Sequence, residues 1–596
     1  MSLPPPPLQR SLFDVSNMLS GSFDPDDRFR LFAEKVYPLL LAARRELEAC
    51  YCPDNGRPGE EPVLLLGATL LQFMERLADR QAAECVKYHT GWKLALMLGL
   101  APTTFHPTTL CNFRQRLLEH DKAKLAFDIV LQGALRAGLV KQRQSQRLDS
   151  THVLGQVAEM SRLECVREAI RLALRELQHA GSSMTQPLGL TMPAWWPRLW
   201  ERYVESKLDY RADRTALIDK MNQAGLDAWE LLCWTQTLSS EAQAAEIRSL
   251  AQGEKVLLLA RVFGENFEPP TATEPPKQMP AQVSAAVKNP HDPDAQYSRK
   301  KGRSATSQKR DSAGDGPDAT APRGGTEWVG YKVQVAETVV DEPREKGEPT
   351  LSLITSVETQ YATASDEAGM KQTLEAQAES NLSPPDKLFV DAAYVSAGAI
   401  GEAESQGREL IGPAQRATNK AHGFKTEAFD VNVENRTAVC PAGHASANCS
   451  RLENKTTGAV SFRFEWGGKN GFCANCPLRA QCLSPGQDHR TLNVGQSHTL
   501  LQTRRRQMQT MEFKQTMKRR NAIEGTQSEL IRGHGLRRAR YRGLPRARLQ
   551  NYFIGAAANV KRWSRRVAWE FKEAARREAE RVKGILRPEI TAETAG

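Results

Sequence analysis

The chain has 596 residues, which is more than one hydrophobic core usually supports, so we expect several domains. Its net charge of +11 favours a polyanionic partner, although basic membrane-surface proteins share this balance. No apolar run reaches the length of a membrane span, and the eleven cysteines are scattered, which argues against membrane-embedded and disulfide-bonded secreted proteins. These features predict a cytoplasmic protein without a membrane partner.

A helical domain is predicted near the start of the chain, over residues 25–138. Its segment VLLLGATLLQFMERLADRQAAECV has apolar residues at helical spacing on one face. The segment FRQRLLEH continues this pattern, and Arg114 and Arg116 would flank its apolar stripe and could reach phosphate. A DNA-binding module and a helical bundle with solvated arginines both fit the pattern.

A short extended segment, SQRLDSTHVLG, contains Asp149 and is followed by about a hundred residues of helical pattern. Within these, Trp195, Trp196 and Trp200 are expected to pack helices together rather than to stack on bases. From Pro269 to Gly325 small and polar residues dominate, so much of this segment should be a linker. Its basic stretch DPDAQYSRKKGR could dock on DNA or be a solvated run of charge.

Regular structure is predicted to resume at TEWVGYKVQVAETVV and TLSLITSVETQYA, which have the composition of neighbouring strands. SDEAGMKQTLEAQAES follows as a helix capped by Ser365, and KLFVDAAYVS is a buried strand that ends at Asp391. The order strand, strand, helix, strand predicts a mixed α/β sheet.

Two cysteine-containing segments, CPAGHASANC and CANCPLRAQC, lie in a loop-rich region between about residues 413 and 500. Four of the cysteines have a spacing that could hold a structural Zn²⁺ ion: Cys440, Cys473, Cys476 and Cys482. Three further residues could substitute as ligands: His444, Cys449 and His489. Unmetallated thiols in a small core and an iron–sulfur cluster are the other interpretations.

Three acidic residues stand in contexts that suit a carboxylate held over catalytic metal ions: Asp149, Asp391 and Glu524. Asp391 closes a buried run, where an unpaired carboxylate is costly. Glu524 lies in the most basic stretch of the chain, where a metal ion and a phosphodiester could meet. Taken singly, each aspartate could be a cap or turn residue, and Glu524 could form an exposed ion pair with an arginine four residues away.

Taken in order along the chain, these segments resemble the insertion-sequence transposases of the IS1182 family, within the DDE (Asp-Asp-Glu) transposases. The matching segments span about residues 25 to 565: FRQRLLEH, RLDSTHV, DPDAQYSRKKG, WVGYKVQVAET, LITSVETQYATASD, KLFVDAAYVS, the two cysteine segments and NAIEGTQSELIRGHGLRRARYRGL. Each alone is weak evidence, but their common order is specific.

The resemblance implies an α/β catalytic core of RNase H-like fold, a mixed sheet with large insertions, preceded by an all-α domain. Asp149 would lie on its first strand, Asp391 on a later strand and Glu524 on a helix after an inserted region. These three carboxylates would hold two Mg²⁺ ions, for which Mn²⁺ could substitute.

Related DDE families carry a Y-x2-R-x3-E-x6-K signature around the glutamate. Here Arg520 matches the arginine, whereas Met517 and Ile531 stand in the tyrosine and lysine positions and Arg532 could replace the lysine. The residues expected to contact DNA are all basic: Arg114, Arg116, Lys332, Arg520, Arg532, Arg537, Arg538, Arg540 and Arg542.

The expected division of the chain is a disordered tail over 1–24, a helical DNA-binding domain over 25–138, a first core part over 139–412 with a helical insertion at 155–265 and a linker at 269–325, a Cys-rich insertion over 413–500, a second core part over 501–566, and a C-terminal helix and tail over 567–596.

The activity implied is Mg²⁺-dependent cleavage and strand transfer of double-stranded DNA at the terminal inverted repeats of a mobile element. Because two element ends must be paired, a homodimer or larger assembly on DNA is expected. A catalytically inactive DNA-binding regulator and a nuclease without strand transfer are the alternatives. Cleavage and joining assays on a duplex that contains an element end would separate the three.

Overall fold

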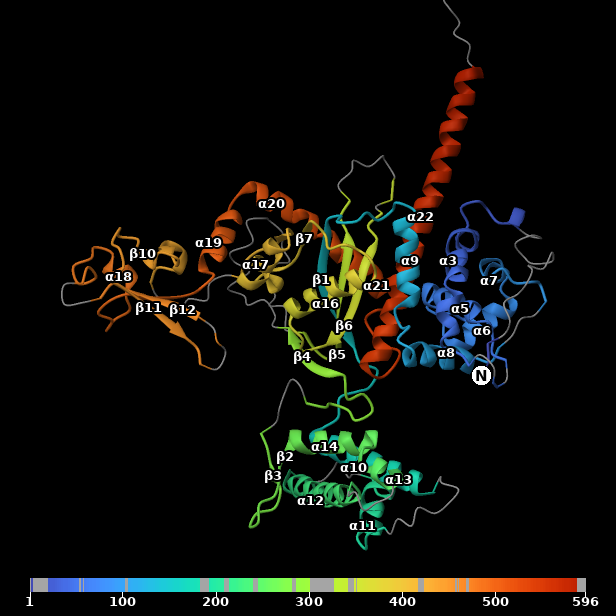
Figure 1. Cartoon of the computed structure of the whole chain (residues 1–596), viewed down its shortest axis with the longest axis horizontal. Coiled ribbons are helices and arrows are strands. Elements are labelled where there is room, and N and C mark those ends of the chain that lie inside the picture. Colours follow the sequence, from blue (N-terminus) through green and yellow to red (C-terminus); the bar gives the residue numbers. More distant parts are fainter. Residues whose placement is uncertain are drawn as a thin grey trace, which may run out of the picture.

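The computed structural model describes residues 2–3, 20–52, 55–56, 58–101, 105–182, 192–207, 214–239, 245–280, 286–300, 326–340, 348–349, 351–415, 423–455, 458, 460–467 and 471–586. A central sheet carries helices on both sides, a helical insertion lies at one end of it, and a small β-rich unit lies to the left (Figure 1). Most of the expected tail over 1–24, and residues 301–325 of the expected linker, lie outside the described ranges. No helix in the described ranges combines the length and the apolar character needed to span a membrane.

The N-terminal region is helical and wraps around one long, buried helix. Its elements are η1 (Ser20–Ser22), α2 (Arg28–Leu31), η2 (Phe32–Val36), α3 (Tyr37–Ala42), α4 (Arg44–Glu48), α5 (Pro62–Glu75), α6 (Asp79–Tyr88), α7 (Thr90–Ala95), α8 (Thr108–Glu119) and α9 (Leu125–Arg136). Every residue of α5 from Pro62 to Met74 is buried. The one-sided apolar face expected from the sequence is therefore wrong for α5, because neighbouring helices cover it on all sides.

A second helical unit lies in the chain between the first and the next strand of the central sheet. Its elements are α10 (Arg162–Ser182), α11 (Trp196–Trp200), η3 (Glu201–Glu205), α12 (Arg214–Leu238), α13 (Ala245–Ala251) and α14 (Glu254–Asn266), and they share a hydrophobic core. Trp196 packs edge-on against Trp234 with ring centroids 5.7 Å apart, and Trp195 and Trp200 pack at the border of the same core. The expectation that these tryptophans pack helices is confirmed.

The central sheet is mixed and has the order β4-β5-β1-β7-β8, with β6 paired to β5. Its strands are β1 (Gln146–Leu154), β4 (Gln296–Lys300), β5 (Thr326–Thr338), β6 (Ile354–Tyr361), β7 (Lys387–Phe389) and β8 (Glu409–Ile411). β1, β5 and β6 pair antiparallel, whereas β1, β7 and β8 pair parallel. This confirms the mixed α/β sheet and the two neighbouring strands predicted from the sequence.

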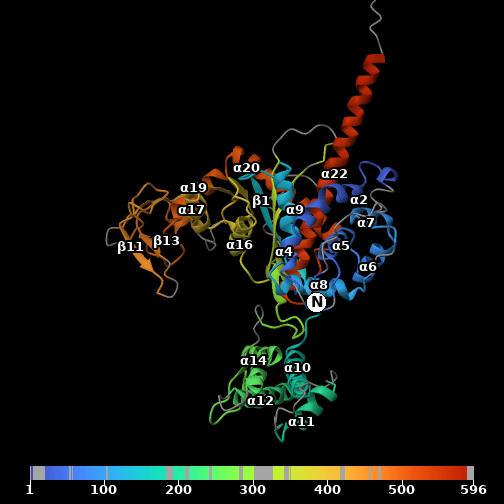
Figure 2. The ribbon, with the colours of Figure 1, turned by 45° about the vertical axis from the view of Figure 1, so that its right-hand side comes forward.

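Helices cover both faces of the sheet (Figure 2). On one face lie α16 (Asp366–Glu379) and α17 (Ala397–Ser405), where Leu148 of β1 and Ala336 of β5 join their apolar cluster. The Ser365 hydroxyl accepts a hydrogen bond from the Ala368 N–H at 3.1 Å, so the predicted helix cap is confirmed. On the other face α22 (Leu544–Leu586) packs against β6, and the Asn559 side chain bonds the Ile354 backbone at 2.8 Å.

Part of the segment expected to be linker forms strands. β2 (Phe267–Glu268) pairs with β3 (Lys277–Gln278), and β4 pairs with β5. Two aspartates before β4 bind the start of α22: the Gly543 N–H donates to Asp292 and the Leu544 N–H donates to Asp294. These bonds satisfy N–H groups that a helix start leaves free, and they hold this piece of chain in place.

The β-rich unit between β8 and the C-terminal helices has a small core of its own. It comprises η5 (Thr426–Ala428), β9 (Asp430–Asn432), β10 (Thr437–Val439), β11 (Asn448–Glu453), β12 (Val460–Glu465), α18 (Arg479–Cys482) and β13 (Thr491–Gly495). From this unit the chain returns to the sheet through α19 (His498–Gln507), α20 (Met511–Met517), η6 (Lys518–Arg520) and α21 (Ala522–His534).

The C-terminal segment forms one helix of 43 residues, α22, rather than a core part followed by a separate helix beyond residue 567. The chain breaks before this helix, because α21 ends at Gly535 in the left-handed conformation with φ of 77°. The first half of α22 is buried against α5, α9 and β6, whereas the second half extends away from the body (Figure 1).

Candidate active site

Asp149 and Asp391 lie on neighbouring parallel strands of the central sheet. β1 pairs with β7 so that Arg147 lies opposite Phe389. Extending this register by two residues places Asp149 level with Asp391, which caps the short 3-10 helix η4 (Ala392–Tyr394). The fold therefore brings together two acids that are far apart in the sequence.

A single guanidinium bridges the two aspartates. Arg520 Nη2 lies 3.0 Å from Asp149 Oδ2 and 3.8 Å from Asp391 Oδ2. The other oxygen of each carboxylate accepts a backbone hydrogen bond, from the Ser150 N–H at 2.8 Å and from the Ala392 N–H at 2.7 Å. Both aspartates thus present one oxygen each to the same cation, and a positive charge is accommodated between them.

Burial sets the protonation behaviour of Asp149. Its side chain is only 17% exposed, and desolvation raises the pKa of its carboxyl above the ordinary value of 3.8. The Arg520 guanidinium opposes this pKa rise, whereas the negative charge of Asp391 adds to it. Lys300, at the end of β4, also lowers the pKa of Asp149 through its charge. The aspartate therefore depends on cations to remain ionised.

Glu524 lies in the first turn of α21 with an exposed side chain. It stands four residues after Arg520, which contacts Asp149, and three residues before Gln527, whose amide donates to the Ser150 carbonyl at 3.2 Å. Residues at three- and four-residue spacing share a helix face, so Glu524 lies on the side of α21 that meets β1. As the side chains stand, no group of three or more His, Cys, Asp or Glu residues in the described ranges is spaced to hold a metal ion.

A buried ionic network fixes α21 against the sheet. Glu337 of β5 is fully buried and accepts hydrogen bonds from Arg147 Nε at 2.5 Å, Thr526 Oγ1 at 2.6 Å and Arg562 Nη1 at 2.8 Å. Arg147 also donates to the Arg519 carbonyl at 3.1 Å. Because Thr526 is two residues from Glu524, the network sets where the candidate glutamate sits relative to Asp149.

The two arginines of the N-terminal helices that were predicted to contact DNA, Arg114 and Arg116, contact other parts of the protein. Arg114 is buried, forms two hydrogen bonds with Asp79 at 2.6 and 3.0 Å, and packs over the Tyr541 ring. Arg116 is half-buried over the Tyr51 ring, with 4.9 Å between the guanidinium carbon and the ring centroid. These contacts hold helices together.

The side chain of Lys332, on β5, also contacts other parts of the protein. Its ammonium donates to the Ala364 carbonyl at 2.6 Å and lies 3.3 Å from Asp366. The side chain therefore fastens the start of α16 to the sheet.

The last turn of α21 and the loop that follows it to α22 contain both exposed and internal arginines. Arg532, Arg538 and Arg542 are exposed. Arg537 is half-buried and donates to the His152 carbonyl at 2.7 Å, and Arg540 donates to the Leu77 carbonyl at 2.9 Å. The two internal arginines tie this segment to β1 and to the N-terminal helices.

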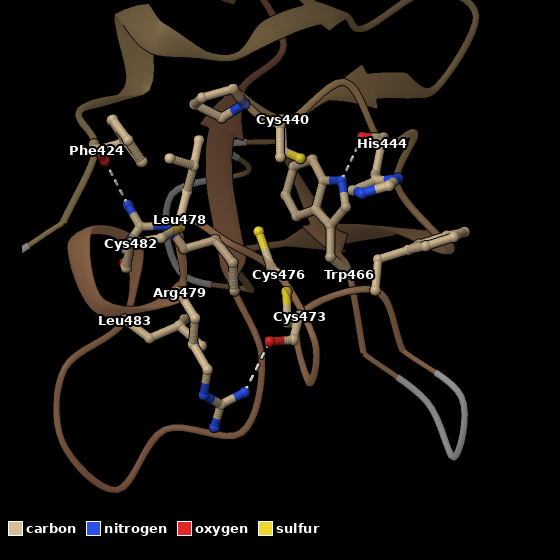
Figure 3. Close-up of a pocket in the computed structure, with 14 residues that line it drawn as sticks. Phe424, Cys440, His444, Trp466, Cys473, Cys476, Leu478, Arg479, Cys482 and Leu483 are labelled. Atoms are coloured by element: carbon tan, nitrogen blue, oxygen red, sulfur yellow. Dashed lines mark hydrogen bonds between the residues drawn. The ribbon is translucent and has the colours of Figure 1, made fainter.

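The four cysteines of the predicted zinc site line one small cavity in the β-rich unit, together with His444 and Trp466 (Figure 3). Cys449 lies on β11 and His489 lies before β13, and neither lines this cavity. None of the cysteines in the described ranges forms a disulfide.

Sequence reasoning missed three residues around the site. Lys300 was read as part of a basic stretch that could dock on DNA or be a solvated run of charge, and its charge was not matched to a buried carboxylate. Gln527 carries a weak signal, its three-residue spacing from Glu524. Glu337 could have been singled out as an acid inside an otherwise apolar strand, where it requires partners.

Two parts of the chain match known protein families. Residues 439–564 match a family described as "Transposase DDE domain", and residues 18–116 match one described as "Transposase domain (DUF772)". The first range includes the four cysteines and Glu524, the second covers most of the N-terminal helices, and Asp149 and Asp391 lie outside both. No curated protein matches the chain. The two matches support assignment of the chain to the DDE transposases, which are enzymes of the nuclease and transposase type.

Proposed function

We propose that the protein is the transposase of an insertion sequence, of the IS1182 family, which cuts DNA at terminal inverted repeats and joins it to a target. The observation that carries this proposal is the convergence of Asp149 and Asp391 on Arg520, beside the helix that bears Glu524. The family assignment to IS1182 rests on the ordered segments of the sequence.

The topology of the sheet supports an RNase H-like core. Along β6-β5-β1-β7-β8, the first three strands are antiparallel and β1, β7 and β8 are parallel, with α16 between β6 and β7 in the chain. In this order β1, the first strand in the chain, is central, and its aspartate lies beside the end of the neighbouring strand β7. Asp149 and Asp391 occupy those two positions.

The carboxylate set fits divalent ions such as Mg²⁺ or Mn²⁺. Hard oxygen ligands suit these ions, and the structure already accommodates one positive charge between the two aspartates. Asp149, Asp391 and Glu524 would hold two ions, and rotation of the exposed Glu524 side chain would complete the set. When bound, such ions activate the attacking oxygen and stabilise the leaving oxygen of a phosphodiester.

Arg520 has a role of its own in this scheme. In the present arrangement its guanidinium pairs with both aspartates and lowers the pKa of Asp149, which favours the ionised carboxylate. If the carboxylates held metal ions, the Arg520 guanidinium would be free to contact the phosphate of a bound strand, because arginine suits bidentate phosphate binding.

The DNA path is proposed to follow the exposed arginines in the last turn of α21 and in the loop between α21 and α22. Arg532, Arg538 and Arg542 can meet phosphates without breaking internal contacts. Double-stranded DNA, as two element ends and a target, is the proposed partner, and pairing the ends requires at least a dimer on DNA. The protein would act in the cytoplasm on chromosomal and element DNA.

Cleavage and joining of a labelled duplex that contains an element end test the proposal. Asp149→Asn should abolish both reactions in Mg²⁺ while leaving DNA binding largely intact. Asp386→Asn is the matched control: Asp386 precedes the same strand, β7, and is 53% exposed, compared with 55% for Asp391. Nicking by Asp149→Asn at the parental rate would refute the catalytic assignment.

A catalytically inactive DNA-binding regulator is the second candidate. It is favoured by one observation, that no three potential ligands in the described part of the chain are spaced for a metal. Such a protein would bind element ends with parental affinity but would neither cut nor join them in Mg²⁺ or Mn²⁺.

A further inference from the structure

The β-rich unit over residues 423–495 has little apolar material to hold it together. Nine buried apolar residues make up its core: Phe429, Val431, Val433, Ala438, Phe462, Phe464, Trp466, Leu492 and Val494. Units of this size rarely reach useful stability from a hydrophobic core alone, and they often carry disulfides or a metal. None of the five cysteines of this unit forms a disulfide, so we consider a metal ion as the group that stabilises it: Cys440, Cys449, Cys473, Cys476 and Cys482.

Three separate pieces of chain bring four thiols to one cavity of about 20 Å³. Cys440 comes from the end of β10, Cys473 and Cys476 from the loop after β12, and Cys482 from the end of α18. Figure 3 shows the sulfurs of Cys440, Cys473 and Cys476 turned towards the space between them. A cavity of this volume holds about one water-sized sphere, which is the scale of a single ion.

Backbone hydrogen bonds fix the turn that carries Cys440. In the Cys-Pro-Ala-Gly-His turn, the Cys440 N–H donates to the His444 carbonyl at 2.9 Å and the Gly443 N–H donates to the Cys440 carbonyl at 2.8 Å. Gly443 has a φ of 84°, which only glycine adopts without strain. The turn is thereby fixed without using the Cys440 thiol.

The second turn is fixed in the same manner. Arg479 Nη1 donates to the Cys473 carbonyl at 2.9 Å, and the Arg479 N–H donates to the Cys476 carbonyl at 3.0 Å. Arg490 donates to the Cys482 carbonyl at 3.4 Å. The arginines thus bind the backbone carbonyls of Cys473, Cys476 and Cys482, and these bonds do not use the sulfur atoms.

The four thiols line the same cavity of about 20 Å³, so their charges would act on one another if all four were ionised. Four thiolates would repel one another in this space, so they require a cation to be present together.

We propose that Cys440, Cys473, Cys476 and Cys482 bind one structural Zn²⁺ ion, which ties the end of β10, the Cys-Ala-Asn-Cys turn and α18 into one unit. Four protein ligands leave no open coordination position, which is the pattern of a structural rather than a catalytic site. The thiols must draw inwards on binding, because in the described ranges no three ligand groups stand at metal-binding spacing. Metal binding and folding of this unit are therefore coupled.

Metal analysis of the purified full-length protein is the first test, with about one zinc per chain expected. Cys476→Ser should lower the zinc content several-fold. Cys449→Ser is the matched control, because Cys449 packs on the same small core but does not line the cavity. Zinc well below one per chain in folded parental protein, or equal zinc in Cys476→Ser and the parent, would overturn the proposal.

Thiol reactivity of the parental protein gives a readout that does not depend on a variant folding. Cys52 and Cys111 are exposed and should react with a thiol reagent at once. Removing zinc with a strong chelator should expose four additional reactive thiols. An unchanged thiol count, or bound iron with visible absorption in place of zinc, would contradict zinc at this site. Asp149→Asn should keep its zinc, so this result is independent of DNA cleavage.

Discussion

Replacing Glu337 with glutamine should loosen α21 from the sheet. Glu337 is fully buried between Arg147 and Arg562, which are each only 7% exposed. One of its oxygens accepts from Arg147, and the other accepts from Arg562 and Thr526. A glutamine amide has only one oxygen, so its NH₂ group must face at least one of these donors.

The expected cost follows from those contacts. At least one charge-assisted hydrogen bond is lost, worth roughly 1.5–3 kcal/mol. Arg147 also loses the acid that neutralises it, and Arg562 keeps only its pair with Glu529 at 2.8 Å. Breaking a buried ion pair by removing one partner costs about 3–5 kcal/mol in total. Glu409→Gln is the matched control: its pair with Lys387 lies in the same sheet at 3.3 Å but is half-exposed, so it should cost less than about 1 kcal/mol.

Hydrogen exchange followed by mass spectrometry suits this test, because a chain of several units does not unfold in one step. Peptides from β1, β5 and α21 should lose protection in Glu337→Gln and keep it in Glu409→Gln. If the unpaired buried charge is the cause, the double variant Glu337→Gln with Arg562→Met should lose less stability than expected. Its loss should be about 0.5–3 kcal/mol smaller than the sum of the losses in the two single variants. Equal protection in Glu337→Gln and the control would refute the anchoring role of the network.

Three further outcomes are expected. The cleavage rate at limiting Mg²⁺ should fall at low pH with a midpoint above the ordinary aspartate pKa of 3.8. The reason is that metal binding requires ionised Asp149 and that burial raises the pKa of Asp149. Arg520→Gln should move that midpoint to higher pH, since Arg520 lowers the pKa of Asp149; a midpoint that stays in place would contradict the pairing. Arg538→Ala and Arg542→Ala should each weaken DNA binding at all sequences and reduce the slope of log K against log salt by about 0.9, whereas Arg540→Met should leave the slope unchanged.

Local elements of this protein were readable from its sequence. The alternating apolar pattern around residues 326–361 predicted two strands, and Ser365 predicted a helix start. The strand predicted to end at Asp391 is present as β7, but it ends two residues earlier, at Phe389. In each case the signal lies within a few residues of the feature, because backbone preference and burial of one face act locally.

Features that depend on distant partners were not readable from local patterns. Arg114 was predicted to contact DNA or to be a solvated arginine, but it is buried because Asp79, on another helix, supplies the opposite charge. The bridge from Asp149 to Arg520 joins residues 371 positions apart. No local pattern in the sequence indicates that Asp149 and Asp391 lie close together. The parallel pairing of β1 with β7 in the structure shows it.

The central claim is that Asp149, Asp391 and Glu524 hold the same metal ions. Mn²⁺ binding to the full-length protein, measured by electron paramagnetic resonance in the presence of an element-end duplex, tests this directly. We expect Asp149→Asn, Asp391→Asn and Glu524→Gln each to weaken Mn²⁺ binding, while Asp386→Asn binds as the parent does. Parental Mn²⁺ affinity and stoichiometry in Glu524→Gln would contradict the shared site.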